Sequence, residues 1–215
     1  MSDTTIDKLA FLTLGWLLGL LGPVIVDAIR RRRENTLGRA AILSELTEVA
    51  GVLSTAAFAA RMRLGTADRQ FLEWVKSTLE QYATTPKLQE FILRLRTQLS
   101  WTDAQLRAAA QYTSADDGKG TMLQHYPTPL LDARVAALWS FDTSFQRQLL
   151  EIRRNFAILD DVVDRSRKYF DMTFTKLEGN NHELVAGNLT QTYEVYAERA
   201  VIIVDLIKSL EAGRE

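Results

Sequence analysis

The chain opens with a polar tail, a long apolar run and a basic cluster. Residues 9–26 are 18 consecutive uncharged residues, and Asp27 and four arginines follow closely. A helix of that length spans roughly 27 Å at about 1.5 Å per residue, close to the roughly 30 Å hydrocarbon core of a bilayer. The pattern therefore predicts a single transmembrane helix over residues 9–29, after a short tail at residues 1–8.

Two other interpretations of the apolar run were weighed and stay open at this point. A cleaved signal peptide would begin with basic residues, whereas Asp3 and Asp7 precede this run and the arginines follow it. A buried helix of a soluble domain would be shorter or would carry a polar face, and this run has none. The pattern favours a spanning helix over both.

The basic cluster predicts the orientation of the helix. Residues 30–36 form a polybasic juxtamembrane linker that contains Arg30, Arg31, Arg32 and Arg33. Because basic residues stay on the cytoplasmic side, we expect the N-terminus outside and the bulk of the chain in the cytoplasm, at the cell inner or plasma membrane. The arginines should also attract anionic lipid, at about 1 kcal/mol per basic residue.

Three glycines lie on one face of the predicted spanning helix. Gly15, Gly19 and Gly22 are spaced at i, i+4 and i+7. Small residues at this spacing form a smooth stripe on which a second membrane helix can pack closely. The stripe predicts that the anchor can form a homo-oligomer.

The rest of the chain repeats apolar residues at helical spacing, which predicts an elongated antiparallel helical bundle over residues 37–212. The first seam alternates spacings of four and three residues: Ile42, Leu46, Val49, Leu53, Ala56 and Ala60. Further helices are expected at about 67–82 and 86–99, with a continuation to about residue 112 that Ser100 or Thr102 caps, and a last helix runs from a cap at Asn180 or Asn181 to about residue 210. Residues 113–129 are the one long loop, and short turns elsewhere make neighbouring helices antiparallel.

The longest seam runs from Leu131 to Phe170. Ten of its twelve positions are apolar, with spacings of four and three throughout, so it predicts one helix of roughly 45 residues. Asp142 is a polar exception within this seam. We expect Asp142 to fix the register of the helix, paired with an arginine or facing a gap in the bundle.

One stretch of this seam carries candidate chemistry. Asp160, Asp161 and Asp164 form a DDxxD arrangement that resembles the first aspartate-rich motif of trans-prenyltransferases. These all-helical enzymes use such aspartates to bind magnesium and, through it, a diphosphate. The resemblance covers about a dozen residues and implies a magnesium-dependent membrane enzyme acting on a lipid diphosphate.

Helical geometry favours a structural role for the same aspartates. At about 100° per residue, they point roughly 120° away from the core direction of the seam. Asp161 with Arg165 and Asp164 with Lys168 are then i, i+4 ion pairs on a solvated face. On this interpretation the protein has no metal site and no catalytic residue.

Composition and charge argue against several classes of function. The formal net charge of −1 gives no support for a nucleic-acid partner, and the absence of cysteine excludes disulfides and thiolate sites. His125 and His182 lie in separate polar stretches without the close spacing of a zinc site, so no cofactor is expected. The sequence favours a membrane-anchored protein that acts by protein–protein contacts as an adaptor, scaffold or subunit of a membrane assembly, with an unidentified protein partner.

Overall fold

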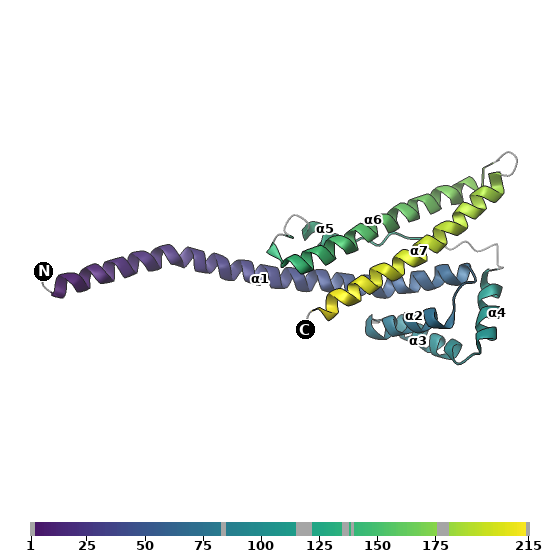
Figure 1. Ribbon diagram of the computed structural model, residues 1–215, viewed down its shortest axis with the longest axis horizontal. Coiled ribbons are helices and arrows are strands. Elements are labelled where there is room, and N and C mark those ends of the chain that lie inside the picture. The colour runs from purple at the N-terminus through teal and green to yellow at the C-terminus, as the bar shows by residue number, and fades with distance from the viewer. Residues whose placement is uncertain are drawn as a thin grey trace. The chain divides into compact units, whose positions relative to one another are not determined.

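The computed structural model describes residues 3–82, 85–114, 122–134, 138, 140–175 and 181–213, with only the backbone at residues 3–10, 17 and 18. These residues form seven α-helices and no strand (Figure 1). The prediction of an all-α protein is confirmed. The chain divides into two compact units, residues 1–42 and residues 43–215, which are considered separately.

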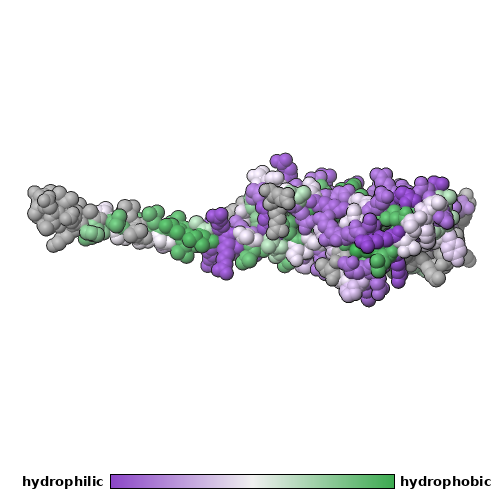
Figure 2. Space-filling view, turned by 90° about the horizontal axis from the view of Figure 1, so that it is seen from below, coloured by the Kyte–Doolittle hydropathy of each residue, from purple (hydrophilic) through white to green (hydrophobic). Residues whose placement is uncertain are grey.

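The described part of the first unit is helical throughout. It belongs to helix α1 (Asp3–Arg63), which also supplies the start of the second unit. The described large apolar side chains between residues 11 and 29 are exposed, with Phe11 at 76% and Val26 at 65%, and they form the green stretch of α1 in Figure 2. Among the described residues, α1 is the one helix that is long and apolar enough to cross a membrane.

The second unit is a helical bundle. After residues 43–63 of α1 come α2 (Arg69–Tyr82), α3 (Pro86–Leu99), α4 (Asp103–Ser114), α5 (Pro129–Arg134), α6 (Thr143–Met172) and α7 (Asn181–Ala212). Helices α6 and α7 run antiparallel along one another, as do α2 and α3 (Figure 1). The core contains fully buried leucine and isoleucine from α1, α2, α6 and α7: Leu46, Leu53, Leu79, Leu149, Ile152, Leu159 and Ile203.

The buried face of α1 in this unit is shifted from the predicted seam. Leu46, Leu53 and Ala60 are buried as expected, but the seam positions Val49 and Ala56 are only half-buried, and Ala50 and Ala57 are fully buried in their place. The other side of the helix carries exposed residues, among them Glu48. This segment of α1 therefore packs one side on the core and leaves the other at the surface.

The prediction of one helix of about 45 residues is wrong. Helix α5 ends at Arg134, α6 begins at Thr143 and has 30 residues, and the seam position Val135 lies outside the described residues. Leu131, Leu138 and Phe145 are nevertheless all buried. The regular spacing therefore reports burial on both sides of a break, not a continuous helix.

Asp142 marks the start of α6. Its backbone is extended, with φ −64° and ψ 152°, and its carboxylate Oδ1 accepts a hydrogen bond from the backbone N–H of Phe145 at 2.8 Å. This is the geometry of a helix N-cap, which satisfies one of the free N–H groups of the first turn. Asp142 is thus a cap and not, as predicted, a polar residue inside a continuous seam.

Glu211 ties the end of α7 to two other helices. Its carboxylate accepts hydrogen bonds from the hydroxyl of Thr47 on α1 at 2.8 Å and from the hydroxyl of Tyr82 on α2 at 2.6 Å. Burial, and then the bond to Glu211, raise the pKa of Tyr82, so its hydroxyl remains a donor near neutral pH. These contacts fix Tyr82 in the wall of the cavity described next.

Candidate functional site

A cavity of about 460 Å³ opens between α1, the start of α3, α7 and the extended residues 122–128. We call residues 122–128 the strap. One side of the cavity follows α1 from Glu48 to Ala60, which are about 18 Å apart along the helix. The volume falls in the range of about 300–1,000 Å³ that is typical of pockets for small molecules.

The lining of the cavity is apolar in its depth and charged at its rim. Ala56, Ala59 and Ala60 of α1 leave space that larger side chains would fill. Buried tyrosines face the same space, whereas Glu48 and Lys87 are exposed. An apolar interior with few polar groups is the common arrangement of a ligand pocket.

Tyr196 is buried in the wall of the cavity next to Tyr126. The residue is 1% exposed. Burial raises its pKa, and the charge of Tyr126 and the hydrogen bond with its hydroxyl raise the pKa further. The Tyr196 side chain therefore stays neutral near neutral pH, with the Tyr126 phenol as its polar neighbour.

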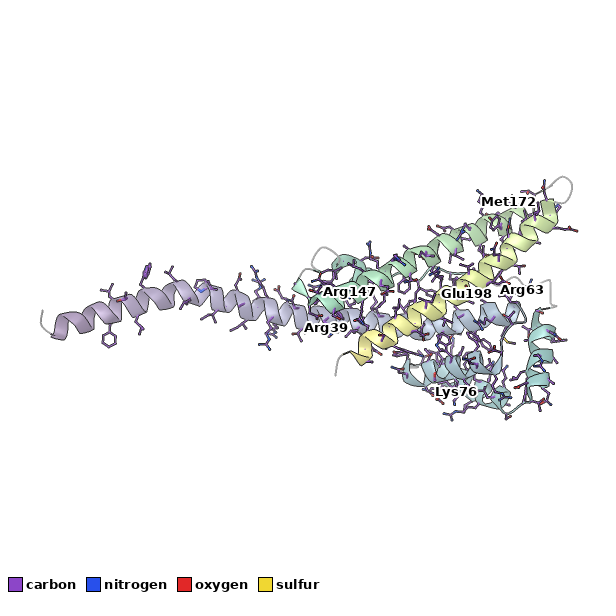
Figure 3. All side chains as sticks on the ribbon, viewed as in Figure 1. Arg39, Arg63, Lys76, Arg147, Met172 and Glu198 are labelled. Atoms are coloured by element: carbon purple, nitrogen blue, oxygen red, sulfur yellow. The ribbon has the colours of Figure 1, made fainter. Side chains whose placement is uncertain are left out.

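The other tyrosines of the cavity are also held neutral. Burial raises the pKa of Tyr126 and of Tyr193, and at Tyr193 the charge of Arg63 opposes this effect. Figure 3 shows Arg63 at the C-terminal end of α1. Near neutral pH the cavity therefore offers phenol hydroxyl groups and not phenolate anions.

His125 fastens the strap to α6. Its Nδ1 lies 2.7 Å from Oδ1 of Asp160, and its Nε2 lies 3.0 Å from Oδ1 of Asp164. The histidine ring therefore joins the strap to two successive turns of α6.

Glu45 holds the chain just beyond the other end of the strap. Its two carboxylate oxygens accept hydrogen bonds from the backbone N–H groups of Leu130 and Leu131 at 2.8 and 2.9 Å. Within the strap itself, Leu123 and Thr128 are buried. The strap is thus an ordered wall of the cavity, held from both α1 and α6.

The aspartates of the DDxxD motif do not form the predicted ion pairs. Asp160 and Asp164 contact His125, and Arg165 donates to the backbone carbonyl of Asp161 at 3.3 Å rather than to its carboxylate. The Asp161 side chain is exposed. Among the described residues, no group of three or more histidine, aspartate or glutamate side chains could hold a metal ion.

The predicted anchor residues lie on the exposed surface of the first unit. A Cβ atom added at Gly15, Gly19 or Gly22 would meet no atom within 4 Å. Helix α1 continues through the predicted linker, where Arg30 pairs with Glu34 at 2.9 Å and Arg31 with Asp27 at 3.4 Å. Helix pairing through the glycines and lipid contact at the arginines remain predictions.

Local sequence patterns did not predict the cavity. Its lining comes from four separated parts of the chain. His125 is 35 residues from Asp160, so no local spacing connects them. Comparison with protein families, curated proteins and solved structures finds no match.

We expect His125→Ala to loosen the strap without unfolding the bundle. The His125 side chain is 34% exposed and its partners more so, so the free energy of unfolding should fall by less than about 1 kcal/mol. Backbone amides of the strap should exchange hydrogen severalfold faster, as measured by exchange mass spectrometry. His182→Ala, at the exposed start of α7, is the matched control. Unchanged exchange in the strap would contradict its fastening by His125.

Proposed function

We propose that the protein is a single-span membrane protein that holds a helical bundle in the cytoplasm and acts through protein–protein contacts, as an adaptor, scaffold or subunit of a membrane assembly. The observation that carries this proposal is the exposed apolar run of α1, followed by consecutive arginines. A stretch of large exposed apolar side chains in water is unfavourable, and a bilayer would cover it.

The arginines support the cytoplasmic orientation. Arg30 to Arg33 follow the apolar run, whereas acidic residues dominate the segment before it. The positive-inside rule then places the N-terminus outside and the bundle inside. Anionic headgroups at the inner surface would be the lipid partners of these arginines.

Two features support a role in contacts. The second unit has its own buried core, so it can present a fixed surface close to the membrane. In the first unit, the stripe of Gly15, Gly19 and Gly22 is open to a helix from another chain, either a second copy or a partner subunit. We infer no nucleic-acid partner, because the chain carries no net basic charge.

Cross-linking in intact membranes, followed by affinity purification and mass spectrometry, tests this proposal. We expect the full chain to recover one or more defined proteins, or a second copy of itself. Two controls separate the contribution of the anchor from that of the bundle. One is residues 1–42 fused to the affinity tag. The other is the full chain with Leu149→Asp, which disrupts the bundle core. Recovery of the same proteins by all three would contradict a contact role for the bundle, and recovery of none by the full chain would contradict the proposal as a whole.

A further inference from the structure

The second unit has a further hollow on its surface, a groove of about 480 Å³ beside α6. One side of it follows α6 from Leu150 to Asp160, which are about 15 Å apart along the helix. The other sides come from residues 126–128 of the strap and from Asp132 of α5. We call this hollow the α6 groove, and every residue that lines it belongs to the second unit.

The α6 groove presents apolar surface to the solvent. Leu150 is 49% exposed, and Ala157, which lies seven residues later on the same face of α6, is also exposed. Pro127 of the strap is exposed beside them in the lining. A large apolar side chain of another molecule can cover this surface and remove it from water.

Four charged side chains line the same groove, and three of them have partners. Nε of Arg153 donates a hydrogen bond to Oδ1 of Asp132 at 3.0 Å, and Oδ1 of Asp160 lies 2.7 Å from Nδ1 of His125. Arg154 is exposed and forms no hydrogen bond or ion pair with any residue that the structure describes. The charged group that the groove leaves open is therefore a guanidinium, whose five N–H donors suit a carboxylate.

The carboxylates of the groove favour a peptide over a simple polyanion. Asp132 and Asp160 line the groove together with Arg153 and Arg154, so a ligand with many negative charges would meet repulsion as well as attraction. A peptide segment combines one carboxylate for Arg154 with backbone N–H groups for which these aspartates are acceptors. Arginine beside apolar and aromatic side chains is also the composition that protein interfaces favour.

We propose that the α6 groove docks a segment of a partner protein in which an aspartate or glutamate lies close to a large apolar side chain. The acidic side chain binds Arg154, and the apolar side chain covers Leu150 and Ala157. This inference rests on the contact role proposed above and deepens it, because it names the docking surface on the bundle and the chemistry of the partner segment.

Site-specific photo-cross-linking of the full chain in intact cells tests the docking surface. The photoreactive amino acid p-benzoylphenylalanine replaces Ala157 in the groove or, as the matched control, Ala104 on the exposed side of α4. We expect a defined cross-linked product from position 157 and none of the same mass from position 104. Mass spectrometry of the product identifies the partner and the segment that is joined.

Charge reversal tests the chemistry of the contact. Arg154→Glu should lower the yield of the product from position 157 about tenfold or more, because a hydrogen-bonded ion pair is lost and like charges meet. Arg94→Glu, the same change at an exposed position of α3, should alter the yield less than about twofold. Replacing the acidic residue of the partner segment with lysine should restore the product with Arg154→Glu but not with the unmodified chain. Circular dichroism checks that each purified variant keeps its helices.

Three results would overturn the proposal. Equal products from positions 157 and 104 would show that the groove is no docking surface. An unchanged yield from a folded Arg154→Glu protein, or a joined segment in which no acidic residue can be reversed to restore the product, would remove the role of the ion pair. If the full chain still recovers its partners while the groove fails these tests, the contact role stands and only the groove is rejected. Recovery of no protein at all rejects both.

Discussion

Leu149→Asp should destabilise the bundle by several kcal/mol. Leu149, the seventh residue of α6, is 0% exposed and belongs to the core. Truncating a buried leucine alone costs about 2–5 kcal/mol, and an unpaired carboxylate in the same place adds to that cost. Chemical denaturation followed by circular dichroism should show a large loss in the free energy of unfolding, or no folded state.

The next residue provides a matched control. Leu150 is 49% exposed, so Leu150→Asp introduces the same side chain on the same turn of α6 but in water. We expect a change within about 0.5 kcal/mol, as for most surface substitutions. If the two variants unfold at similar denaturant concentrations, α6 does not contribute its Leu149 face to the core.

Removing residues 1–33 should convert the protein from a membrane protein to a soluble one. The deletion takes away the apolar run and the four arginines but leaves the second unit complete. Because that unit has its own core, the shortened chain should be strongly helical and unfold cooperatively. Cell fractionation checks that the shortened chain is soluble, circular dichroism checks that it is helical, and thermal denaturation checks that it unfolds cooperatively.

The deletion can fail in two informative ways. A shortened chain that still sediments with washed membranes would show that the apolar run is not the main anchor. A soluble but unfolded or aggregated chain would show that the bundle depends on lipid or on the first unit for its stability. Either result contradicts the account of an independent bundle on a single anchor.

Local signals predicted most of the helices. Pro86, which suits the first turn of a helix, indicated the start of α3, and the spacing of Phe71, Val75 and Leu79 identified the buried face of α2. The cap at Thr85 was not predicted. In each case the residues that determine the element lie within one or two turns of each other. This is the range over which a sequence pattern reports structure directly.

The break between α5 and α6 was missed for a physical reason. Apolar residues before and after the break both face the core, so their spacing continued by coincidence through residues 135–142. Asp142 followed by Thr143 and Ser144 is a local capping signal, but the regular spacing of the seam led to its interpretation as a polar position inside one helix. The spacing of the seam predicted which residues are buried, but it did not predict whether they belong to one continuous helix.

Local sequence patterns did not predict the candidate site. His125 contacts Asp160 and Asp164 because the strap passes beside α6, and Tyr196 lies in the cavity wall because residues of α1 and α7 line the same cavity. Such encounters depend on the arrangement of whole helices. The sequence indicated which residues could take part in chemistry, but it did not indicate which of them meet.

Cysteine accessibility in intact cells tests the central claim, a single span with the bundle in the cytoplasm. The chain has no cysteine, so Thr4→Cys and Ser209→Cys each introduce one thiol, before the anchor and near the end of the bundle. A maleimide that cannot cross membranes should label Thr4→Cys in intact cells, with the outer membrane permeabilised where there is one. It should label Ser209→Cys only after the inner or plasma membrane is opened. Labelling of Ser209→Cys in intact cells, or equal labelling at both positions, would contradict the proposed topology.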